Sequence, residues 1–450
     1  QGCPLSPLLF TLYISDVDDA FRGCTGAVTG TETLRVTHLL FADDLALTAN
    51  NTGHLQQMLN RLRAYATRKG LVVNSDKTQV VNFNTYATST VDDVCYDGRK
   101  LEKQDSFKYL GMLFDKRMNL INSLSHAARP FQAAIRRIKE FAADKGLVDR
   151  PHAMFWLFKA YAISAGMYAS QIWATPFLRA DKVFGTKLQV KHVCFLKRIL
   201  KVKDSTANWV VLRECAQEPL QFYWFRAAGR FWNSMVRSNS NTLRSVLRAD
   251  VILGNSGCDR CWSRQLKDAM ADLRAANEFR GCLLNFAMLD VARLAADVRF
   301  RHHAIWREVE GQNPRTYGKK SAVYHNWFGL PVKGYSESRP SVRVPLYLTL
   351  NLNRRVVRDV SRFRMRAHRL KCEEGVYGTD RSQYMCDLCD CGEVQDELHV
   401  VFRCPHPHLV QLRQEYRHLF DVSSSDLKVF TNQNNVDVYK FLSALIRFFD

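Results

Sequence analysis

The stretch Phe41-Ala42-Asp43-Asp44 decides how this chain is interpreted. It lies between two apolar runs, residues 34–40 and 45–49, whose Leu, Val and Thr residues favour two strands joined by a tight turn. Adjacent carboxylates repel each other, and one explanation is a solvent-exposed turn, where aspartate is common. The other explanation is a divalent metal site, because Mg²⁺ prefers carboxylate oxygens and two such ions can catalyse phosphoryl transfer.

Three further blocks accompany this stretch in a fixed order. The chain begins Gln1-Gly2-Cys3-Pro4-Leu5-Ser6-Pro7, and Gly70-Leu71-x-x-Asn74-x-x-Lys77-Thr78 and Phe107-Lys108-Tyr109-Leu110-Gly111 follow the acidic pair. Between the acidic pair and Gly70, an apolar stripe with cap residues at 50–53 predicts a helix that ends at Gly70. In order and spacing, the four blocks resemble those of the reverse transcriptases of non-LTR (LINE-type) retrotransposons, over residues 1 to about 115.

The resemblance implies a fold, an activity and a set of site residues. The fold is α+β: a partial right-hand polymerase palm, then a helical thumb and connection. The activity is RNA-directed DNA polymerisation, a nucleotidyl transfer at two Mg²⁺ ions. Asp43 would be a direct metal ligand, Asp44 a second carboxylate, and Phe41 would lie against the primer end or the incoming nucleotide. The residues implied to line the nucleotide and template pocket are Gln1, Gly2, Pro4 and Ser6.

Lys77 has two interpretations. In the family it would stabilise or protonate the pyrophosphate leaving group, a role that suits a compact ammonium. The alternative is a solvated loop lysine.

The chain departs from the family at its start. The family's first catalytic aspartate lies on a strand before the block that begins at Gln1, and neither that strand nor the fingers region is in the sequence. Asp16, Asp18 and Asp19 follow the block and are in the wrong order. We therefore expect a C-terminal portion of the enzyme that does not polymerise alone. The alternative is a non-catalytic remnant that binds nucleic acid through a basic helix and a zinc module.

The charge balance indicates a polyanionic partner. The 450 residues include 64 Lys and Arg against 44 Asp and Glu, a net charge of +20, which favours nucleic acid over an acidic membrane surface. The expected partners are an RNA template, a DNA primer or target, and dNTPs. No secretory signal or apolar run of about 18 residues is evident, and the 13 scattered cysteines suit a reducing, nuclear or cytoplasmic compartment.

Beyond the palm, the sequence predicts mainly helices and one linker. The predicted divisions are a partial palm (1–115), a helical thumb (116–204), a helical connection with a linker (205–345), a basic helical segment (346–380), a zinc module (381–410) and a helical tail (411–450).

Residues 353–371 carry eight Lys and Arg residues against one acidic residue, Asp359. Apolar residues recur every three to four positions, which predicts an amphipathic helix with a basic face. A membrane-surface helix is the alternative, although its apolar face would be thin. The residues predicted to contact nucleic-acid phosphates are Arg355, Arg358, Arg362, Arg366 and Arg369.

A second cluster of chemistry-bearing residues lies near the C-terminus. Cys386-x-x-Cys389 is followed by His399 and Cys404, four ligands that suit one tetrahedral, structural Zn²⁺. Cys391 and His406 are spare donors, so other ligand sets stay open. The segment 386–405 also resembles the C-terminal zinc-binding motif of LINE-type reverse transcriptases, which implies contact with template RNA or target DNA.

Overall fold

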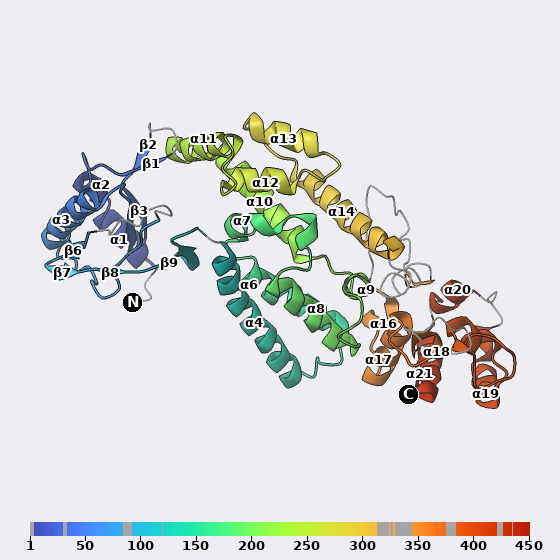
Figure 1. The fold of residues 1–450 in the computed structure, drawn as a ribbon. Coiled ribbons are helices and arrows are strands. Elements are labelled where there is room, and N and C mark those ends of the chain that lie inside the picture. The colour runs from blue at the N-terminus through green and yellow to red at the C-terminus, as the bar shows by residue number, and fades with distance from the viewer. Residues whose placement is uncertain are drawn as a thin grey trace.

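The computed structural model describes residues 4–29, 34–83, 92–118, 120–312, 324, 327, 328, 344–374, 384–420, 426–433 and 435–450, with the backbone alone over 307–312. Figure 1 shows an N-terminal lobe of strands and helices at one end, a central body of helices, and a C-terminal helical lobe at the other end. Most of the linker predicted at 313–345 lies outside the described residues.

In its described residues, the N-terminal lobe combines three helices with short paired strands, which matches the α+β character predicted for this part. Its helices are α1 (Ser6–Tyr13), α2 (Val17–Ala20) and α3 (Thr52–Lys69). Its antiparallel pairs are β1 (Ala27–Thr29) with β2 (Leu34–Val36), β3 (His38–Phe41) with β4 (Asp44–Leu47), β6 (Cys95–Tyr96) with β7 (Arg99–Lys100), and β9 (Ser106–Tyr109) with β10 (Met112–Asp115). β5 (Gln79–Val80) pairs in parallel with β8 (Glu102–Lys103).

Helix α3 forms as its sequence predicts. The side chain of Asn51 accepts a hydrogen bond from the backbone N–H of His54, across 2.8 Å, which satisfies one free donor at the N-terminus. Gly70 ends the helix with a φ of 60°, a conformation that glycine adopts without strain. The buried face of α3 packs Met58 and Tyr65 against α2 and the β3–β4 pair, and this small core fixes the position of the acidic turn.

The central body is helical from α4 to α14, as predicted. Its helices are α4 (Leu120–Asp144), α5 (Pro151–Leu157), a π-helix (Phe158–Ile163), α6 (Ser164–Gly166), α7 (Ser170–Trp173), two 3₁₀ turns (Thr175–Phe177 and Ala180–Lys182), α8 (Lys187–Leu200), α9 (Asn208–Glu214), α10 (Leu220–Arg237), α11 (Asn241–Asn255), α12 (Trp262–Ala269), α13 (Ala276–Leu284) and α14 (Val291–Gln312). Large aromatic side chains such as Phe131, Trp173 and Trp224 fill the core, where burial of apolar surface stabilises the fold.

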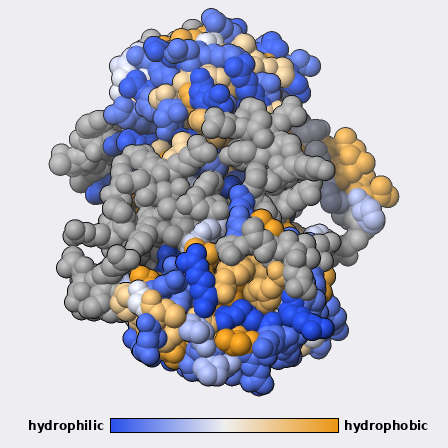
Figure 2. Space-filling model, turned by 90° about the vertical axis from the view of Figure 1, so that its right-hand side faces the viewer, coloured by the Kyte–Doolittle hydropathy of each residue, from blue (hydrophilic) through white to orange (hydrophobic). Residues whose placement is uncertain are grey.

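The C-terminal lobe continues the same apolar core. Its elements are α16 (Leu346–Thr349), α17 (Arg354–Arg364), α18 (Lys371–Glu374), a π-helix (His399–Arg403), α19 (Pro407–Glu415), a 3₁₀ turn (Arg417–Leu419), α20 (Leu427–Thr431) and α21 (Val436–Phe449). Helix α17 packs along α21. Seen from this end, the described surface is largely hydrophilic with apolar patches between the polar side chains (Figure 2).

The basic helix is shorter than its sequence predicts. We expected a helix over residues 353–371, but α17 ends at Arg364. Arg366 then adopts a φ of 50°, in the left-handed region that cannot continue a right-handed helix. The chain turns there because the side chains that follow enter buried contacts, described below.

Within the described part of the chain, no helix combines the length and apolar character needed to cross a bilayer.

Candidate active site and metal centre

The acidic stretch forms the predicted hairpin. β3 and β4 pair antiparallel with Phe41 opposite Asp44, so Ala42 and Asp43 make a two-residue turn. Ala42 has a φ of 52°, the positive value that tight hairpin turns require at a central position. The turn therefore holds the two carboxylates at the tip of a strand pair, with Asp43 in the turn and Asp44 beginning β4.

Both carboxylates are exposed, and the ring of Phe41 beside them is 61% exposed. Among the described residues, no third acidic, histidine or cysteine group joins them in a metal-binding cluster. An open pair of carboxylates fits Mg²⁺, which keeps several waters and is commonly held by one or two carboxylates together with substrate phosphates. The described residues thus supply part of a magnesium site.

The β9–β10 hairpin, which contains the fourth block, lies close to this pair. Burial raises the pKa of Tyr109, and the charge of Asp44 raises it further, so the two side chains are within electrostatic reach. The turn of the hairpin contacts the central body, because the hydroxyl of Tyr168 donates a hydrogen bond to the backbone oxygen of Leu110. A Cβ added at Gly111 would lie 3.1 Å from the Tyr168 ring, which explains a glycine at this position.

The structure gives less support to the other residues predicted for this site. Lys77 is exposed in a turn after α3, where its backbone N–H donates to Asn74. Within the described chain, no hydrogen bond or ion pair joins Lys77 to Asp43 or Asp44. Pro4 and Ser6 are exposed at the start of α1. Gln1 and Gly2 lie outside the described residues.

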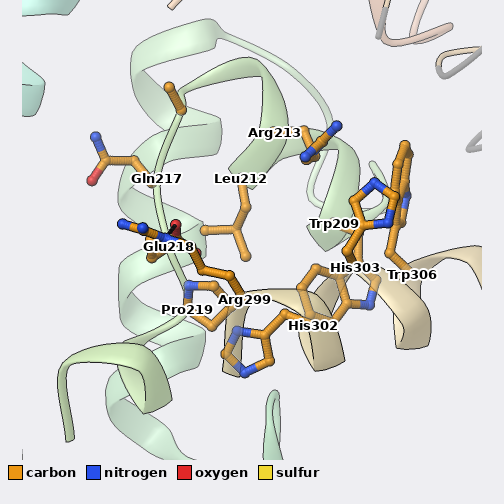
Figure 3. Close-up of a pocket in the computed structure, with 11 residues that line it drawn as sticks. Trp209, Leu212, Arg213, Gln217, Glu218, Pro219, Arg299, His302, His303 and Trp306 are labelled. Atoms are coloured by element: carbon orange, nitrogen blue, oxygen red, sulfur yellow. Dashed lines mark hydrogen bonds and ion pairs between the residues drawn. The ribbon is translucent and has the colours of Figure 1, made fainter. Parts of the chain in front are cut away.

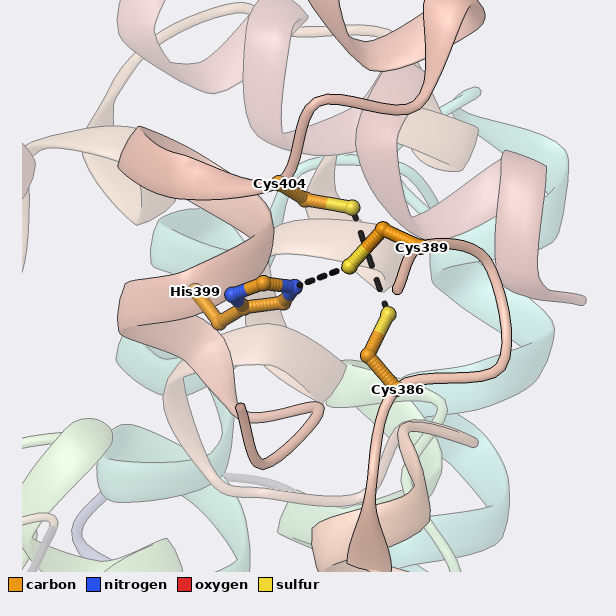
Figure 4. A group of neighbouring side chains, drawn as sticks. All are labelled: Cys386, Cys389, His399 and Cys404. Atoms are coloured by element: carbon orange, nitrogen blue, oxygen red, sulfur yellow. Dashed lines mark hydrogen bonds between the residues drawn. The ribbon is translucent and has the colours of Figure 1, made fainter. Parts of the chain in front are cut away.

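The four predicted zinc ligands come together. One donor atom from each of Cys386, Cys389, His399 and Cys404 lies within 4.8 Å of the others (Figure 4). The Sγ atoms of Cys386 and Cys404 are 3.9 Å apart, and Sγ of Cys389 is 3.3 Å from Nε2 of His399. A tetrahedral Zn²⁺ with Zn–S bonds of about 2.3 Å places two sulfurs about 3.8 Å apart. The donor set and its spacing therefore fit Zn²⁺.

Glu393 supports the histidine of this cluster, a role that sequence reasoning missed. Its Oε2 atom lies 2.9 Å from Nδ1 of His399, so Nδ1 carries the proton and Nε2 is left to face the thiols. A carboxylate in this position orients a metal-binding imidazole and raises its basicity. The signal in the sequence was an acidic residue between the cysteine pair and the histidine. The spare donors, Cys391 and His406, lie outside the cluster.

The thiols of the cluster differ in acidity. For Cys389, burial favours the neutral thiol, but hydrogen bonds from the Cys391 backbone, Cys386 and His399 outweigh burial and lower its pKa to about 7. For Cys404, burial raises the pKa to about 12. A metal ion binds Cys389 and Cys404 as thiolates, so metal binding would release protons from these thiols. Cys404 would release more than Cys389, because its pKa is higher.

The structure corrects the predicted nucleic-acid contacts. Arg366 is 6% exposed and pairs with Glu373 at 2.7 Å and Glu397 at 2.8 Å, so it is not available to a phosphate. The reason is the turn after Arg364, which directs this side chain inward toward the zinc module.

The other four arginines differ in their surroundings. Arg362 forms an ion pair with Asp450, and Arg358 pairs with Asp359 at 2.7 Å. Arg355 and Arg369 are exposed, and Arg369 donates to the backbone oxygen of Asp450 across 3.0 Å. Phosphate contact by these residues stays a prediction, and it is best supported for Arg355.

Known proteins resemble parts of this chain, above all its N-terminal part. Residues 1–114 match the family model of the reverse transcriptases (RNA-dependent DNA polymerases). The chain is similar to the RNA-directed DNA polymerase from mobile element jockey of Drosophila funebris, with 22% identity over 205 residues, 44% of this chain and 21% of that protein. It is also similar to the retrovirus-related Pol polyprotein from type-1 retrotransposable element R2 of Nasonia vitripennis, with 32% identity over 126 residues, 26% of this chain and 12% of that protein.

A third relative is a putative uncharacterized transposon-derived protein of Caenorhabditis elegans, 25% identical over 206 residues, 43% of this chain and 70% of that protein. The match to the jockey protein thus spans about a fifth of that relative's length. The N-terminal part of the chain is a reverse transcriptase domain. Over part of its length, the chain is similar to the reverse transcriptases of LINE-type retrotransposons.

Proposed function

We propose that this chain is part of an RNA-directed DNA polymerase of a LINE-type retrotransposon. The observation that carries the proposal is the position of Asp43 and Asp44. They lie at the tip of a hairpin inside the segment that matches the reverse transcriptases, and Asp44 is within electrostatic reach of Tyr109 on the next block. Exposed carboxylates at a turn, with the β9–β10 hairpin nearby, suit the binding of metal-bound nucleotide phosphates.

Asp43 and Asp44 would hold Mg²⁺ in this function. When bound, such ions lower the pKa of an attacking hydroxyl and neutralise the charge of a departing pyrophosphate. Phe41 offers an exposed ring beside the carboxylates, where it would pack against the primer end or the incoming nucleotide. Lys77 would hold a proton and a positive charge for the leaving group, which requires the loop after α3 to approach the turn when substrate binds.

Nucleotide binding tests this proposal without requiring turnover. The chain is mixed with an RNA template, a DNA primer and a labelled dNTP in Mg²⁺, and retention of the dNTP is measured. We expect template-directed retention that is lost in Asp43→Asn. The matched control is Asp76→Asn, which removes another exposed carboxylate of the same lobe, 89% exposed. Binding of template–primer without any dependence on dNTP or Asp43 would favour the non-catalytic remnant instead.

Catalysis by the chain alone is a separate expectation. With no third ligand among the described residues, the two carboxylates should hold a metal pair poorly. We expect no primer extension by the chain on its own. Extension that Asp43→Asn abolishes would contradict this expectation and would still support the polymerase.

For the C-terminal cluster, we propose one structural Zn²⁺ bound by Cys386, Cys389, His399 and Cys404. The support is the soft donor set at tetrahedral spacing and the carboxylate of Glu393 on His399. The zinc module would fix the turn that follows α17, where Glu397 pairs with Arg366. Its exposed cations would then contact template RNA or target DNA. Elemental analysis of the purified chain tests the metal, and a chain without zinc would contradict the assignment.

A further inference from the structure

Three large aromatic side chains lie exposed along one helical stretch of the central body. Trp156, Tyr161 and Tyr168 are 63%, 60% and 58% exposed. One exposed ring is ordinary, but rings of this size usually bury most of their apolar surface. Three within residues 156–168, here called the aromatic stripe, indicate a surface that a partner covers.

A π-helix brings the first two rings of the stripe to the same side. In an α-helix, residues five apart lie about 140° apart around the axis, so Trp156 and Tyr161 would face different ways. The π-helix Phe158–Ile163 bonds residue i to residue i+5 and changes this register. Leu157 and Ala162, also five apart, are both buried, and the residues just before them are the two exposed rings. Such π-helical turns occur frequently at functional sites.

Small side chains separate the rings. Ala160 and Ser164 are exposed on the same stretch, and the hydroxyl of Ser164 donates back to the backbone oxygen of Ala160 across 2.7 Å. The rings therefore rise above a low surface. Trp156 and Tyr161 are about 7 Å apart along the helix axis, about twice the 3.4 Å per nucleotide of a duplex strand. This spacing suits separate, unstacked bases.

The charge around the stripe favours a polyanion. Residues 150–180 contain no Asp or Glu, and Lys159 is exposed between the first two rings in the sequence. Lys159 is within electrostatic reach of Glu218, but that carboxylate already pairs with Arg299 at 2.6 Å. Both residues of this pair line a cavity around His302, where α9 ends, α10 begins and α14 passes beside them (Figure 3). The positive charge of Lys159 is thus left for a partner of the stripe.

The stripe ends at the β9–β10 hairpin. The hydroxyl of Tyr168 donates to the backbone oxygen of Leu110 in the turn of that hairpin. Burial and the charges of Lys108 and Arg129 lower the pKa of His126, so these two cations lie near each other. Both are exposed, one on β9 and the other on α4. A polyanion on the stripe would therefore meet further positive charge at this end.

Rings with cations nearby also occur at membrane surfaces and at protein interfaces. A membrane-surface helix needs a continuous apolar face, whereas Lys159, Ala160 and Ser164 interrupt this one. The buried centre of a protein interface is depleted in charged residues, and lysine is among those depleted. Rings that alternate with a cation are typical of single-strand binding surfaces, because every base has a π-face that stacks on an aromatic ring.

We propose that the aromatic stripe binds a single-stranded nucleic acid. Bases stack on Trp156 and Tyr161, and Lys159 contacts a phosphate between them. The strand continues past Tyr168 toward the cations at the hairpin. This inference goes beyond the proposed polymerase function and does not depend on it, because it assigns no role to the acidic turn.

Strands with and without bases test the stacking. The probes are a short oligothymidylate and an abasic deoxyribose-phosphate strand of the same length, both without Mg²⁺ or dNTP. We expect Trp156→Ala to bind oligothymidylate about 5- to 150-fold more weakly and the abasic strand unchanged. Trp156→Phe keeps a ring and should retain most of the affinity. The control is Ile252→Ala, which removes a side chain that is 51% exposed on α11.

Photochemical cross-linking locates the strand on the surface. Oligothymidylate that carries one 5-iodouracil is irradiated in complex with the chain, and the cross-linked peptide is identified by mass spectrometry. We expect cross-links at Trp156 or Tyr161. Each should disappear when its own ring is removed, in Trp156→Ala or in Tyr161→Ala, and persist in Ile252→Ala.

A charge variant tests the phosphate contact. Lys159 is exposed, so Lys159→Gln should fold normally. We expect it to weaken both strands equally and to reduce the slope of log affinity against log salt by about 0.7, one phosphate contact on a single strand. Arg280→Gln, at an exposed site on α13, is the control and should leave the affinity unchanged.

Three results would overturn the proposal. The first is an equal loss for both strands in Trp156→Ala, with the melting temperature unchanged. The second is unchanged affinity in Trp156→Ala and Tyr161→Ala, with no cross-link on the stripe. The third is binding of phosphatidylserine vesicles that depends on Trp156 and displaces oligothymidylate, which would assign the stripe to a membrane. Loss of dNTP retention in Asp43→Asn bears on the polymerase site alone, so failures of the two proposals are distinguishable.

Discussion

Arg364 of α17 donates from Nε to Oε1 of Glu214 at the end of α9 across 2.6 Å, and both side chains are buried. The two residues are 150 positions apart in the chain. The hydroxyls of Tyr324 and Tyr347 donate to the same carboxylate at 2.5 and 2.7 Å. This buried network joins the C-terminal lobe to the central body, and it satisfies a charge that would otherwise be costly in the interior.

Removing one partner of this pair should destabilise the protein strongly. Glu214→Gln leaves the Arg364 charge buried without a counter-charge, which costs about 3–5 kcal/mol. The double variant Glu214→Gln with Arg364→Met should recover much of this loss, because no unpaired charge remains. The measurement is the free energy of unfolding in urea. Glu278→Gln is the control, since Glu278 and its partner Arg293 are each 51% exposed and such a pair contributes at most about 1 kcal/mol. Equal losses in the free energy of unfolding for Glu214→Gln and Glu278→Gln would contradict this prediction.

His192 should make stability depend on pH. Burial lowers its pKa to about 3, against about 6.5 in an unfolded chain. Between these values the unfolded state binds a proton that the folded state does not, so this contribution to stability falls as the pH is lowered below about 6.5.

Phenylalanine at this position should remove that dependence. The ring of His192 stacks on Phe158 with centroids 4.8 Å apart, and its Nε2 has no partner among the described residues. We expect His192→Phe to gain about 2 kcal/mol relative to wild type on going from pH 7 to pH 5. Urea unfolding at both pH values measures this, with His408→Phe as the control. Parallel pH profiles for wild type and His192→Phe would refute the assignment.

Zinc binding by substituted chains should distinguish the four proposed ligands from the neighbouring donors. Cys386→Ser should abolish stoichiometric zinc, whereas Cys391→Ser should retain it because Cys391 lies outside the cluster. Glu393→Gln should weaken zinc binding about 10- to 100-fold by releasing His399 from its hydrogen bond. Competition with a chromophoric chelator measures all three. Loss of zinc in Cys391→Ser equal to that in Cys386→Ser would show a different ligand set.

Local features of this fold could be predicted because nearby residues determine them. The caps of α3 at Asn51 and Gly70 and the turn between β3 and β4 depend on a few adjacent side chains. The zinc cluster could also be predicted, because the short spacing of Cys386, Cys389, His399 and Cys404 keeps the four ligands near one another in space.

Contacts between residues far apart in the sequence could not be predicted in the same way. Arg366 looked like part of a basic face, yet Glu373 and Glu397 draw it inside, and only the folded chain brings Glu397 near it. The cavity around His302 was missed for the same reason, because α9, α10 and α14 contribute to it from separate parts of the sequence. Burial of a charge depends on its partner, and a helical pattern does not specify that partner.

The central claim is that Asp43 and Asp44 bind a divalent metal beside nucleotide phosphates, and metal-directed cleavage tests it most directly. Fe²⁺ replaces Mg²⁺ in the complex of the chain with template, primer and dNTP. Added hydrogen peroxide oxidises the bound Fe²⁺ to Fe³⁺ and is split into hydroxide and a hydroxyl radical, which cuts the nearby backbone. We predict cuts within the β3–β4 turn and near Tyr109 of β9, both lost in Asp43→Asn and kept in Asp76→Asn. Cleavage that spares residues 41–44, or that persists unchanged in Asp43→Asn, would contradict the account.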